Sequence, residues 1–290
     1  MSRAMRPCLL GVPWDRSSSF APGAAAGPPG IRNALWSAST NSATELGIAI
    51  DTAALGDDGD LALGADAAQA RRDIEHGVAA ILARHEVPFV LGGDHSITYP
   101  VLRAFTKAPV AAILHIDAHS DLYDEFPLPE PGQPGGPGDR YSHACPFARI
   151  LEDGLAPRLV QVGIRTATPH LVAQATRFGV EVYDMRRWRD APVDALPGPL
   201  YVSLDLDGLD PAFAPGVAHP EPGGLATRDV VELLHRIRVP IAGADIVEYN
   251  PHFDQRDLTA RVAAKLLKEL VAVAIRNRRP DAVRQLDSTA

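Results

Sequence analysis

The stretch at residues 110–121 is VAAILHIDAHSD, an apolar run followed at once by acidic residues and a histidine. A continuous apolar run of this length is typical of a parallel strand that is covered on both faces. Residues two positions apart point to the same side of an extended chain, so Asp117, His119 and Asp121 are expected to face one way. The stretch therefore predicts a buried strand that ends in a polar site.

Similar short apolar runs alternate with helical patterns through most of the chain. Apolar residues at helical spacing predict one helix over 66–85, capped by Asp66, and another over about 257–277. Strands are predicted at 7–12, 47–52, 87–91, 110–116, 158–164, 179–183, 199–206 and 240–247. This alternation predicts an α/β fold of three layers (α/β/α) around a mostly parallel central sheet. No repeat or clear boundary divides the chain, so a single domain over 1–290 is expected.

One segment breaks the alternation. Residues 127–139, PLPEPGQPGGPGD, contain so many Pro and Gly that neither a helix nor a strand is expected there. The prediction is a surface loop. A functional loop and a flexible insertion both fit this composition.

Composition excludes several classes of function. The 290 residues carry a net charge of −8, which argues against nucleic acid as a partner, and 46% hydrophobic residues allow a sizeable core. Two cysteines do not make a disulfide scaffold and favour a reducing compartment. No apolar run approaches the roughly 20 residues that span a bilayer. The start of the chain resembles a first strand more than a leader, so a cytoplasmic location without membrane contact is expected.

Two further polar clusters follow predicted strands. GGDHS occupies 92–96 after the strand at 87–91, and Asp205-Leu-Asp207 closes the strand at 199–206. Each alone is a weak signal, because Gly-Gly-Asp makes turns and Asp-x-Asp caps them. Ligand sites in α/β sheets form outside the carboxyl ends of strands, so three such clusters predict one shared site.

The chemistry of these clusters indicates metal. Converging carboxylates repel one another and lose hydration unless cations neutralise them. The donor set lacks thiolates and suits Mn²⁺ or a similar ion, and shared carboxylates allow two ions that hold a hydroxide nucleophile. The six candidate ligands are His95, Asp117, His119, Asp121, Asp205 and Asp207.

With these motifs in place, the sequence resembles the ureohydrolase family, which includes arginases and agmatinases. The motifs are GGDHS, DAHSD and SLDLDGLDPAFAPG, and the resemblance covers nearly the whole chain. STNSATE (39–45), YSHACPFARI (141–150) and PGVAHPEPGG (215–224) look most similar to plant-type arginases. The resemblance implies an arginase-like fold and two Mn²⁺ ions, with bridging ligands Asp117 and Asp205, His95 and Asp121 on one ion, and His119 and Asp207 on the other.

The resemblance also implies catalytic and substrate-binding residues. His143 matches a histidine proposed to carry protons to the leaving amine, Glu248 matches a glutamate that grips the guanidinium group, and Asp121 completes the predicted catalytic set. A carboxylate at the end of a strand suits a planar cation. His219 either faces the substrate or packs against the loop. His115, inside a strand, is expected to be a hydrogen-bonded core histidine, and Cys145 a packing residue.

The implied reaction is hydrolysis of a small guanidino compound to urea and an amine by a hydroxide that bridges two manganese ions. L-Arginine is favoured as substrate, and agmatine or another guanidino acid is the alternative. A zinc deacetylase-like enzyme and a non-catalytic arginine-sensing subunit are further alternatives, but both normally have fewer of these ligands. The family also implies a homo-oligomer, either a trimer or a hexamer.

Overall fold

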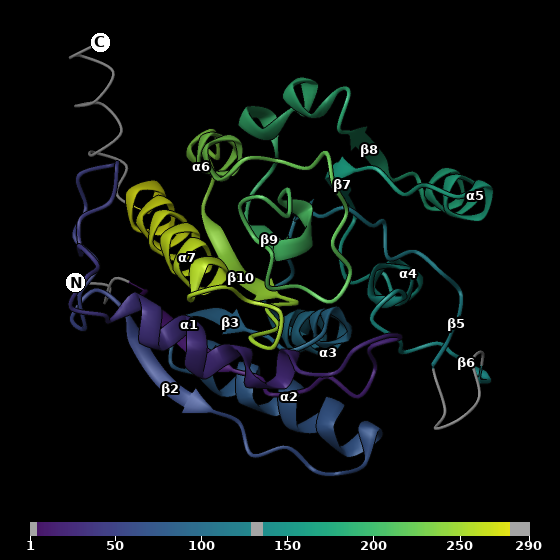
Figure 1. The fold of residues 1–290 in the computed structure, drawn as a ribbon, viewed down its shortest axis with the longest axis horizontal. Coiled ribbons are helices and arrows are strands. Elements are labelled where there is room, and N and C mark those ends of the chain that lie inside the picture. The colour runs from purple at the N-terminus through teal and green to yellow at the C-terminus, as the bar shows by residue number, and fades with distance from the viewer. Residues whose placement is uncertain (1–4, 129–135, 279–290) are drawn as a thin grey trace.

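The computed structural model describes residues 5–128 and 136–278, and an eight-stranded sheet forms its centre (Figure 1). The strand order is β2-β1-β3-β10-β9-β4-β7-β8, and each pair of neighbouring strands is parallel. The strands are β1 (Pro7–Gly11), β2 (Gly56–Asp60), β3 (Val87–Leu91), β4 (Ala112–Ile116), β7 (Leu159–Ile164), β8 (Glu181–Asp184), β9 (Leu200–Asp205) and β10 (Ile241–Val247). The predicted parallel α/β sheet is confirmed.

Helices cover both faces of the sheet and complete three layers (Figure 1). Residues of α1 (Gly27–Leu35), α6 (Thr227–His235) and α7 (Leu258–Asn277) join the core on one face. Residues of α2 (Ala67–Ala83), α3 (Thr98–Arg103), α4 (Pro146–Glu152) and α5 (Pro169–Phe178) join the core on the other face. Short 3-10 helices lie at Ala24–Ala26, His95–Ile97, Ala104–Lys107, Trp188–Asp190, Val193–Ala195 and Leu206–Gly208.

The two long helices form as their apolar spacing predicts, with one correction. The side chain of Asp66 accepts a hydrogen bond from the backbone N–H of Gln69 at 2.8 Å, and so caps α2. In α7, Leu266 and Leu270 are fully buried. Leu258 has the same helical spacing as Leu266 and Leu270 and was expected to be buried with them. It is instead 41% exposed because it is the first residue of the helix.

The strand predicted at 47–52 is wrong. The described backbone there makes one isolated bridge, between Ala43 and Ala49, and the second strand is β2, with the sequence GDDGD. β2 is an edge strand that pairs only with β1, and its carboxylates form ion pairs with Arg32. A polar, half-exposed edge strand lacks the apolar signature by which the other strands are recognised.

The Pro/Gly-rich loop has more order at its ends than predicted. β5 (Phe126–Pro127) pairs antiparallel with β6 (Gly138–Asp139), so the expectation of no strand over 127–139 is wrong at both ends, and 129–135 lie outside the described residues. The guanidinium of the buried Arg149 donates to the carbonyls of Asp124 at 2.6 Å and Arg140 at 3.0 Å. These bonds hold the two ends of the segment together. A two-residue strand at an edge tolerates Pro because only one side of that strand is hydrogen-bonded to a neighbour.

None of the helices in the described part of the chain has the length and apolar character of a membrane-spanning segment.

Candidate active site

The three predicted clusters meet at the carboxyl edge of the sheet. β3, β10, β9 and β4 are consecutive in the centre of the sheet, although they are far apart in sequence. Because all four run the same way, the residues after them lie on one edge: His95 after β3, Glu248 after β10, Asp205 at the end of β9 and Asp117 after β4. Such an edge is where α/β sheets bind ligands.

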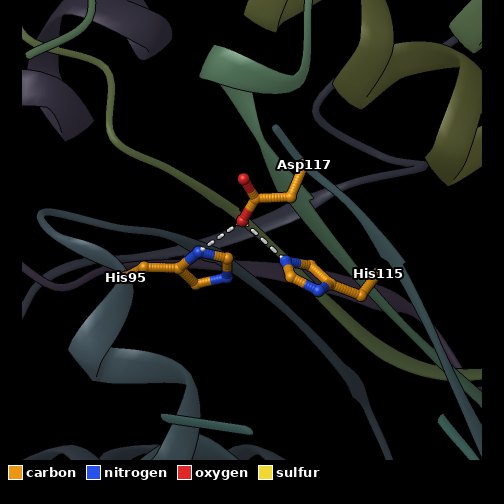
Figure 2. A group of neighbouring side chains, drawn as sticks. All are labelled: His95, His115 and Asp117. Carbon is orange, nitrogen blue, oxygen red and sulfur yellow. Dashed lines mark hydrogen bonds and ion pairs between the residues drawn. The ribbon is translucent and has the colours of Figure 1, made fainter. Parts of the chain in front are cut away.

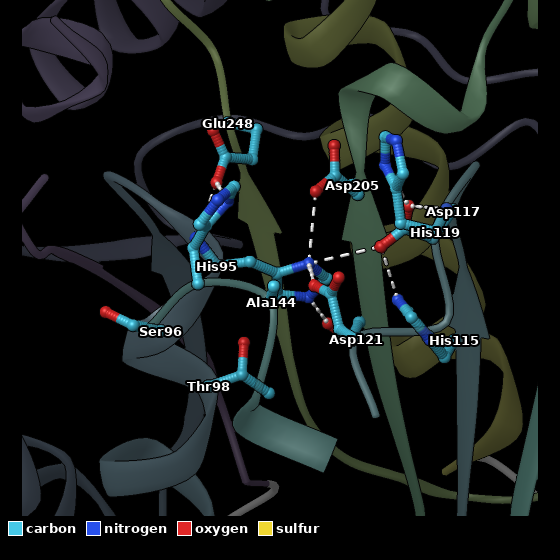
Figure 3. A network of polar contacts seen from close by, with 12 residues as sticks. His95, Ser96, Thr98, His115, Asp117, His119, Asp121, Ala144, Asp205 and Glu248 are labelled. Atoms are coloured by element: carbon cyan, nitrogen blue, oxygen red, sulfur yellow. Dashed lines mark hydrogen bonds and ion pairs between the residues drawn. The ribbon is translucent and has the colours of Figure 1, made fainter. Parts of the chain in front are cut away.

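His95 is surrounded by carboxylates (Figure 3). Its Nδ1 atom lies 3.2 Å from Asp117 Oδ2, 3.1 Å from Asp121 Oδ2 and 3.0 Å from Asp205 Oδ2. Among the described residues this buried nitrogen nevertheless has no hydrogen-bond partner. An imidazole nitrogen with three carboxylate oxygens around it supplies the donor types that a divalent cation such as Mn²⁺ prefers.

A second group of donors lies beside the first. The Nδ1 atom of His119 lies 3.0 Å from Asp207 Oδ2 and 3.5 Å from Asp117 Oδ1. Asp117 therefore contributes one oxygen to each group. His119, Asp117 and Asp207 are close enough together to hold a metal ion. The arrangement suits two cations that share a carboxylate.

The acid–base properties of these carboxyl groups also favour the binding of cations between them. Burial and the charges of Asp207 and Asp117 raise the pKa of Asp205 well above its usual value. Burial likewise raises the pKa of Asp207 to about 7, although His119 opposes the shift. Burial acts in the same direction on Asp117, but contacts with His115, His119 and His95 lower its pKa overall. Positive ions bound beside Asp205 and Asp207 would offset the cost of ionising these two buried carboxyl groups.

His115 supports Asp117 from inside the sheet, as the sequence predicts (Figure 2). The Nε2–H of His115 donates to Asp117 Oδ2 at 2.7 Å, on the opposite side of that oxygen from His95. Nδ1 of His115 lies 3.0 Å from the side-chain amide of Gln161, which also donates to the carbonyl of Ser120. The amide therefore fixes which ring nitrogen carries the proton.

A cavity of about 260 Å³ opens onto this site. Histidines, carboxylates including that of Glu221, and aromatic and aliphatic side chains line it. The lining consists of Ser19, His119, Asp121, Tyr123, Phe126, His143, Ala144, Thr166, Leu171, Asp205, Asp207, His219 and Glu221. The size suits a small, partly apolar molecule with a polar end.

The two other predicted catalytic side chains are paired with each other. His143 Nδ1 lies 3.3 Å from Glu248 Oε1, and this oxygen also accepts the backbone N–H of His95 at 2.8 Å. Burial lowers the pKa of His143, but the hydrogen bond to Glu248 raises it overall. The Nε2 atom of His143 lies 2.8 Å from the hydroxyl of Ser19. Ser19 was not identified from the sequence, since SSSF at 17–20 resembles an ordinary turn.

His219 faces the cavity. Its ring lies beside that of His143, with centroids 5.0 Å apart, and its Nε2 is 3.4 Å from the Ser19 hydroxyl. Burial lowers the pKa of His219. Its ring therefore lines the cavity, which is the position expected of a residue that faces a substrate.

The backbone has unusual local geometry at three motif residues, Asp121, Glu248 and Gly93. Asp121 and Glu248 adopt positive φ angles of 49° and 65°, a conformation that is uncommon outside glycine and is often found at functional sites. Gly93 packs so closely on the backbone of Trp14 that a Cβ there would collide with it. This close approach brings the segment with Ser19 to the site.

Cys145 and two other histidines have structural roles. The Cys145 thiol is fully buried and contacts the carbonyl of Asp139, and burial raises its pKa to about 12, which is unfavourable for a nucleophile. His170 stacks on Tyr123, and His235 contacts the buried Glu269. None of them adds a donor to the site.

A parallel sheet with paired carboxylate–imidazole groups at its carboxyl edge defines an α/β protein with a candidate two-metal site, and sites of this kind activate water for hydrolysis. The family model that matches is that of the Arginase family, over residues 6–272. The chain belongs to this family and is a ureohydrolase.

Individual relatives and a solved structure are similar to the chain over most of its length. The chain is 47% identical to "Arginase 1, mitochondrial" of Arabidopsis thaliana over 91% of this chain and 80% of the relative. The solved structure of an arginase from Medicago truncatula matches with a TM-score of 0.85 and 44% identity, over 93% of this chain and 88% of that one. A guanidinopropionase of Pseudomonas aeruginosa is 35% identical, over 93% of this chain and 87% of that protein.

The expected cytoplasmic location is wrong by this comparison. Plant arginases that match over most of the chain are named as mitochondrial or as chloroplastic and mitochondrial. Cysteine content and the apolar residues near the N-terminus do not determine the compartment, because transit segments have no single apolar signature.

Proposed function

We propose that this chain hydrolyses L-arginine to L-ornithine and urea with two bound Mn²⁺ ions. The observation that carries the proposal is the approach of three carboxylate oxygens to Nδ1 of His95, with a second group around His119. His95 and Asp121 would hold one ion, His119 and Asp207 the other, and Asp117 and Asp205 both. When bound, the ions supply a hydroxide nucleophile near neutral pH.

Glu248 is proposed to orient the guanidinium group. Its side chain is nearly fully buried, and one of its oxygens is anchored by the backbone N–H of His95. With Oε1 engaged by His95 and His143, the second oxygen, Oε2, is the one that would accept a hydrogen bond from the planar guanidinium. The pKa of Glu248 is lowered because His143 outweighs the effect of burial, so it carries the charge that such a pairing needs.

His143 is proposed to give a proton to the leaving amine. The raised pKa keeps its ring protonated nearer to neutral pH, where a general acid is effective. Nδ1 is oriented by Glu248, so the proton at Nε2, beside the Ser19 hydroxyl, is the one directed toward the cavity. Ser19 and His219 lie next along this path and could return a proton from solvent.

The cavity favours a substrate with an ammonium group at its far end. Among the described residues that line it, none is Lys or Arg, whereas Glu221 offers a carboxylate. Arg165 donates to the backbone carbonyl of Glu221 at 2.6 Å and fixes its position, so Arg165 itself is fully occupied. Both arginine and agmatine carry an ammonium group. A guanidino acid that carries only a carboxylate would have no cationic partner.

Arginine is preferred because the plant relatives are named arginases, and agmatine is the second candidate because no described lining residue offers a positive charge to the α-carboxylate. A guanidino-acid hydrolase is less well supported for the same reason. The test is urea release by manganese-loaded protein with arginine, agmatine, 4-guanidinobutyrate and 3-guanidinopropionate. Turnover of arginine alone supports the proposal. Faster turnover of agmatine would make agmatine the proposed substrate. Absence of urea from every compound would refute the proposal.

We also propose that 1–290 act as one ureohydrolase domain and that the chain assembles as a trimer or hexamer, as the family resemblance implies. Neither nucleic acid nor a membrane is a proposed partner. Light scattering coupled to gel filtration tests the assembly directly. A monomer at micromolar concentration would contradict it.

A further inference from the structure

A buried carboxylate behind the site is not used in the proposed mechanism. Asp245 lies in β10 and is fully buried, where an ionised group is costly unless several hydrogen bonds stabilise it. Three hydroxyls donate to it: Ser203 at 2.7 Å, Tyr201 at 2.7 Å and Thr98 at 2.8 Å. Three hydroxyl donors to one buried carboxyl group call for a functional explanation.

Ser203 connects this carboxylate to His95. The Ser203 hydroxyl donates its only proton to Asp245 Oδ1, so its oxygen is left to accept the hydrogen bond from His95 Nε2 at 2.9 Å. His95 must then carry its proton on Nε2. In the neutral ring that binds a metal ion, the lone pair would then be on Nδ1, the atom that lies 3.0–3.2 Å from carboxylate oxygens of Asp117, Asp121 and Asp205.

The sheet holds this chain of contacts rigidly. Ser203 in β9 is the direct cross-strand partner of Asp245 in β10, and on its other side it pairs with His115 in β4. Partners in register lie on the same face of neighbouring strands. Two positioning groups, His115 behind Asp117 and Ser203 behind His95, therefore stand side by side beneath the metal site.

We propose that Asp245, acting through Ser203, fixes the Nε2-protonated form of His95 and so prepares Nδ1 to bind a metal ion. The inference rests on the proposed metal site. Both residues are positioning residues, because neither touches the substrate or the ion. Hydrogen-bond partners of this kind typically change metal affinity by about 10- to 100-fold.

The test compares three variants by manganese content and affinity. Ser203→Ala removes the acceptor for His95 Nε2 and is expected to weaken one of the two ions about 10- to 100-fold. Asp245→Asn is expected to act at least as strongly, because its amide donates to Ser203, turns the hydroxyl proton toward His95 and favours the wrong tautomer. Tyr201→Phe is the matched control, since it removes a donor to the same carboxylate but leaves the Ser203–His95 contact intact.

The readouts are titration with Mn²⁺, metal content after dialysis and the electron paramagnetic resonance spectrum. The expected result is a fall from two ions to one, with an isolated-ion spectrum in place of a coupled pair, in Ser203→Ala and Asp245→Asn only. Unchanged affinity in Ser203→Ala, or an equal loss in Tyr201→Phe, would overturn the inference. Thermal melting of each variant in the presence of chelator shows whether the variant is folded without metal. If Asp245→Asn is misfolded, the manganese affinity of Ser203→Ala is the deciding measurement. A wild-type protein that binds no manganese would instead refute the proposed function.

Discussion

His143, which lines the cavity, pairs with the buried Glu248, and His143 Nδ1 lies 3.3 Å from Glu248 Oε1. The two residues are 105 positions apart in sequence and reach the site from a loop and from the end of β10. Their pairing joins the group proposed to hold the guanidinium to the group proposed to protonate the leaving amine. It also separates the roles of binding and proton transfer, so that substitutions at the two residues have different kinetic effects.

Glu248→Gln is expected to retain both metals and lose affinity for the guanidinium group. The charged pair with substrate is buried, and loss of one partner of such a pair costs about 2–5 kcal/mol, which is roughly 30-fold or more in kcat/KM. Steady-state kinetics and metal analysis on the same sample test this. Loss of a metal ion would show that Glu248 organises the site instead of the substrate.

His143→Ala is expected to lower kcat by about 10²- to 10⁴-fold with little change in KM, as for other general acids. The pH profile should lose the limb that reports this group, and added imidazole should restore part of the rate. A variant with the wild-type kcat would exclude proton transfer by His143.

Chelation is expected to destabilise the protein, because Asp205 and Asp207 then face each other without cations. Metal bound at 100 times its Kd adds about 2.7 kcal/mol to the free energy of unfolding. Thermal melting with chelator and then with excess Mn²⁺ measures the difference. Asp205→Asn is the control and should show a much smaller response to Mn²⁺; an equal response would place the stabilising ion elsewhere.

The sequence predicted the parts of this molecule that have strong local signals. Buried parallel strands are continuous apolar runs, and β4 and β9 end in the acidic motifs that form the site. β2 was missed because an edge strand of sequence GDDGD is polar and depends on Arg32 for its charge balance. Local pattern contains no information about such a tertiary partner.

Residues that act through another residue were also missed. Ser203 and Asp245 lie inside apolar strands and are 42 positions apart, and their function depends on the register between these two strands. A polar residue within a buried strand, two or three positions before a motif residue, was the available signal: Ser203 precedes Asp205, and Asp245 precedes Glu248. Ser19 had no comparable signal, because its position depends on the packing of Trp14 against Gly93.

Glu221→Gln is expected to raise KM for arginine or agmatine about three- to fivefold, the range for loss of one partly exposed ion pair. The effect should disappear with butylguanidine, which has the same reactive group and no ammonium. Comparison of the two substrates separates recognition of the far end from damage to the site. An equal rise in KM for both would assign Glu221 a structural role.

Glu269→Gln is expected to destabilise the fold without changing catalysis. The buried carboxylate of Glu269 accepts hydrogen bonds from His235 at 2.8 Å and from the backbone N–H of Glu45 at 3.0 Å, and it also pairs with Lys265. Replacement by a neutral amide should reduce the free energy of unfolding by about 1.5–3 kcal/mol, the range for hydrogen bonds to a charged group. Glu232→Gln, the same change at an exposed position of α6, is the control and should have little effect.

The pH dependence of stability gives the second test of Glu269. Burial raises its pKa, but Lys265, the N–H of Glu45 and His235 outweigh burial and lower it. Because the folded-state pKa lies below the unfolded value of about 4.3, the ionised carboxylate stabilises the fold above that pH. This stabilisation is lost as the pH falls through the folded-state pKa. Urea unfolding at a series of pH values should therefore show wild type and Glu269→Gln converging toward acid pH, and a difference that stays constant down to the lowest pH would contradict the assignment.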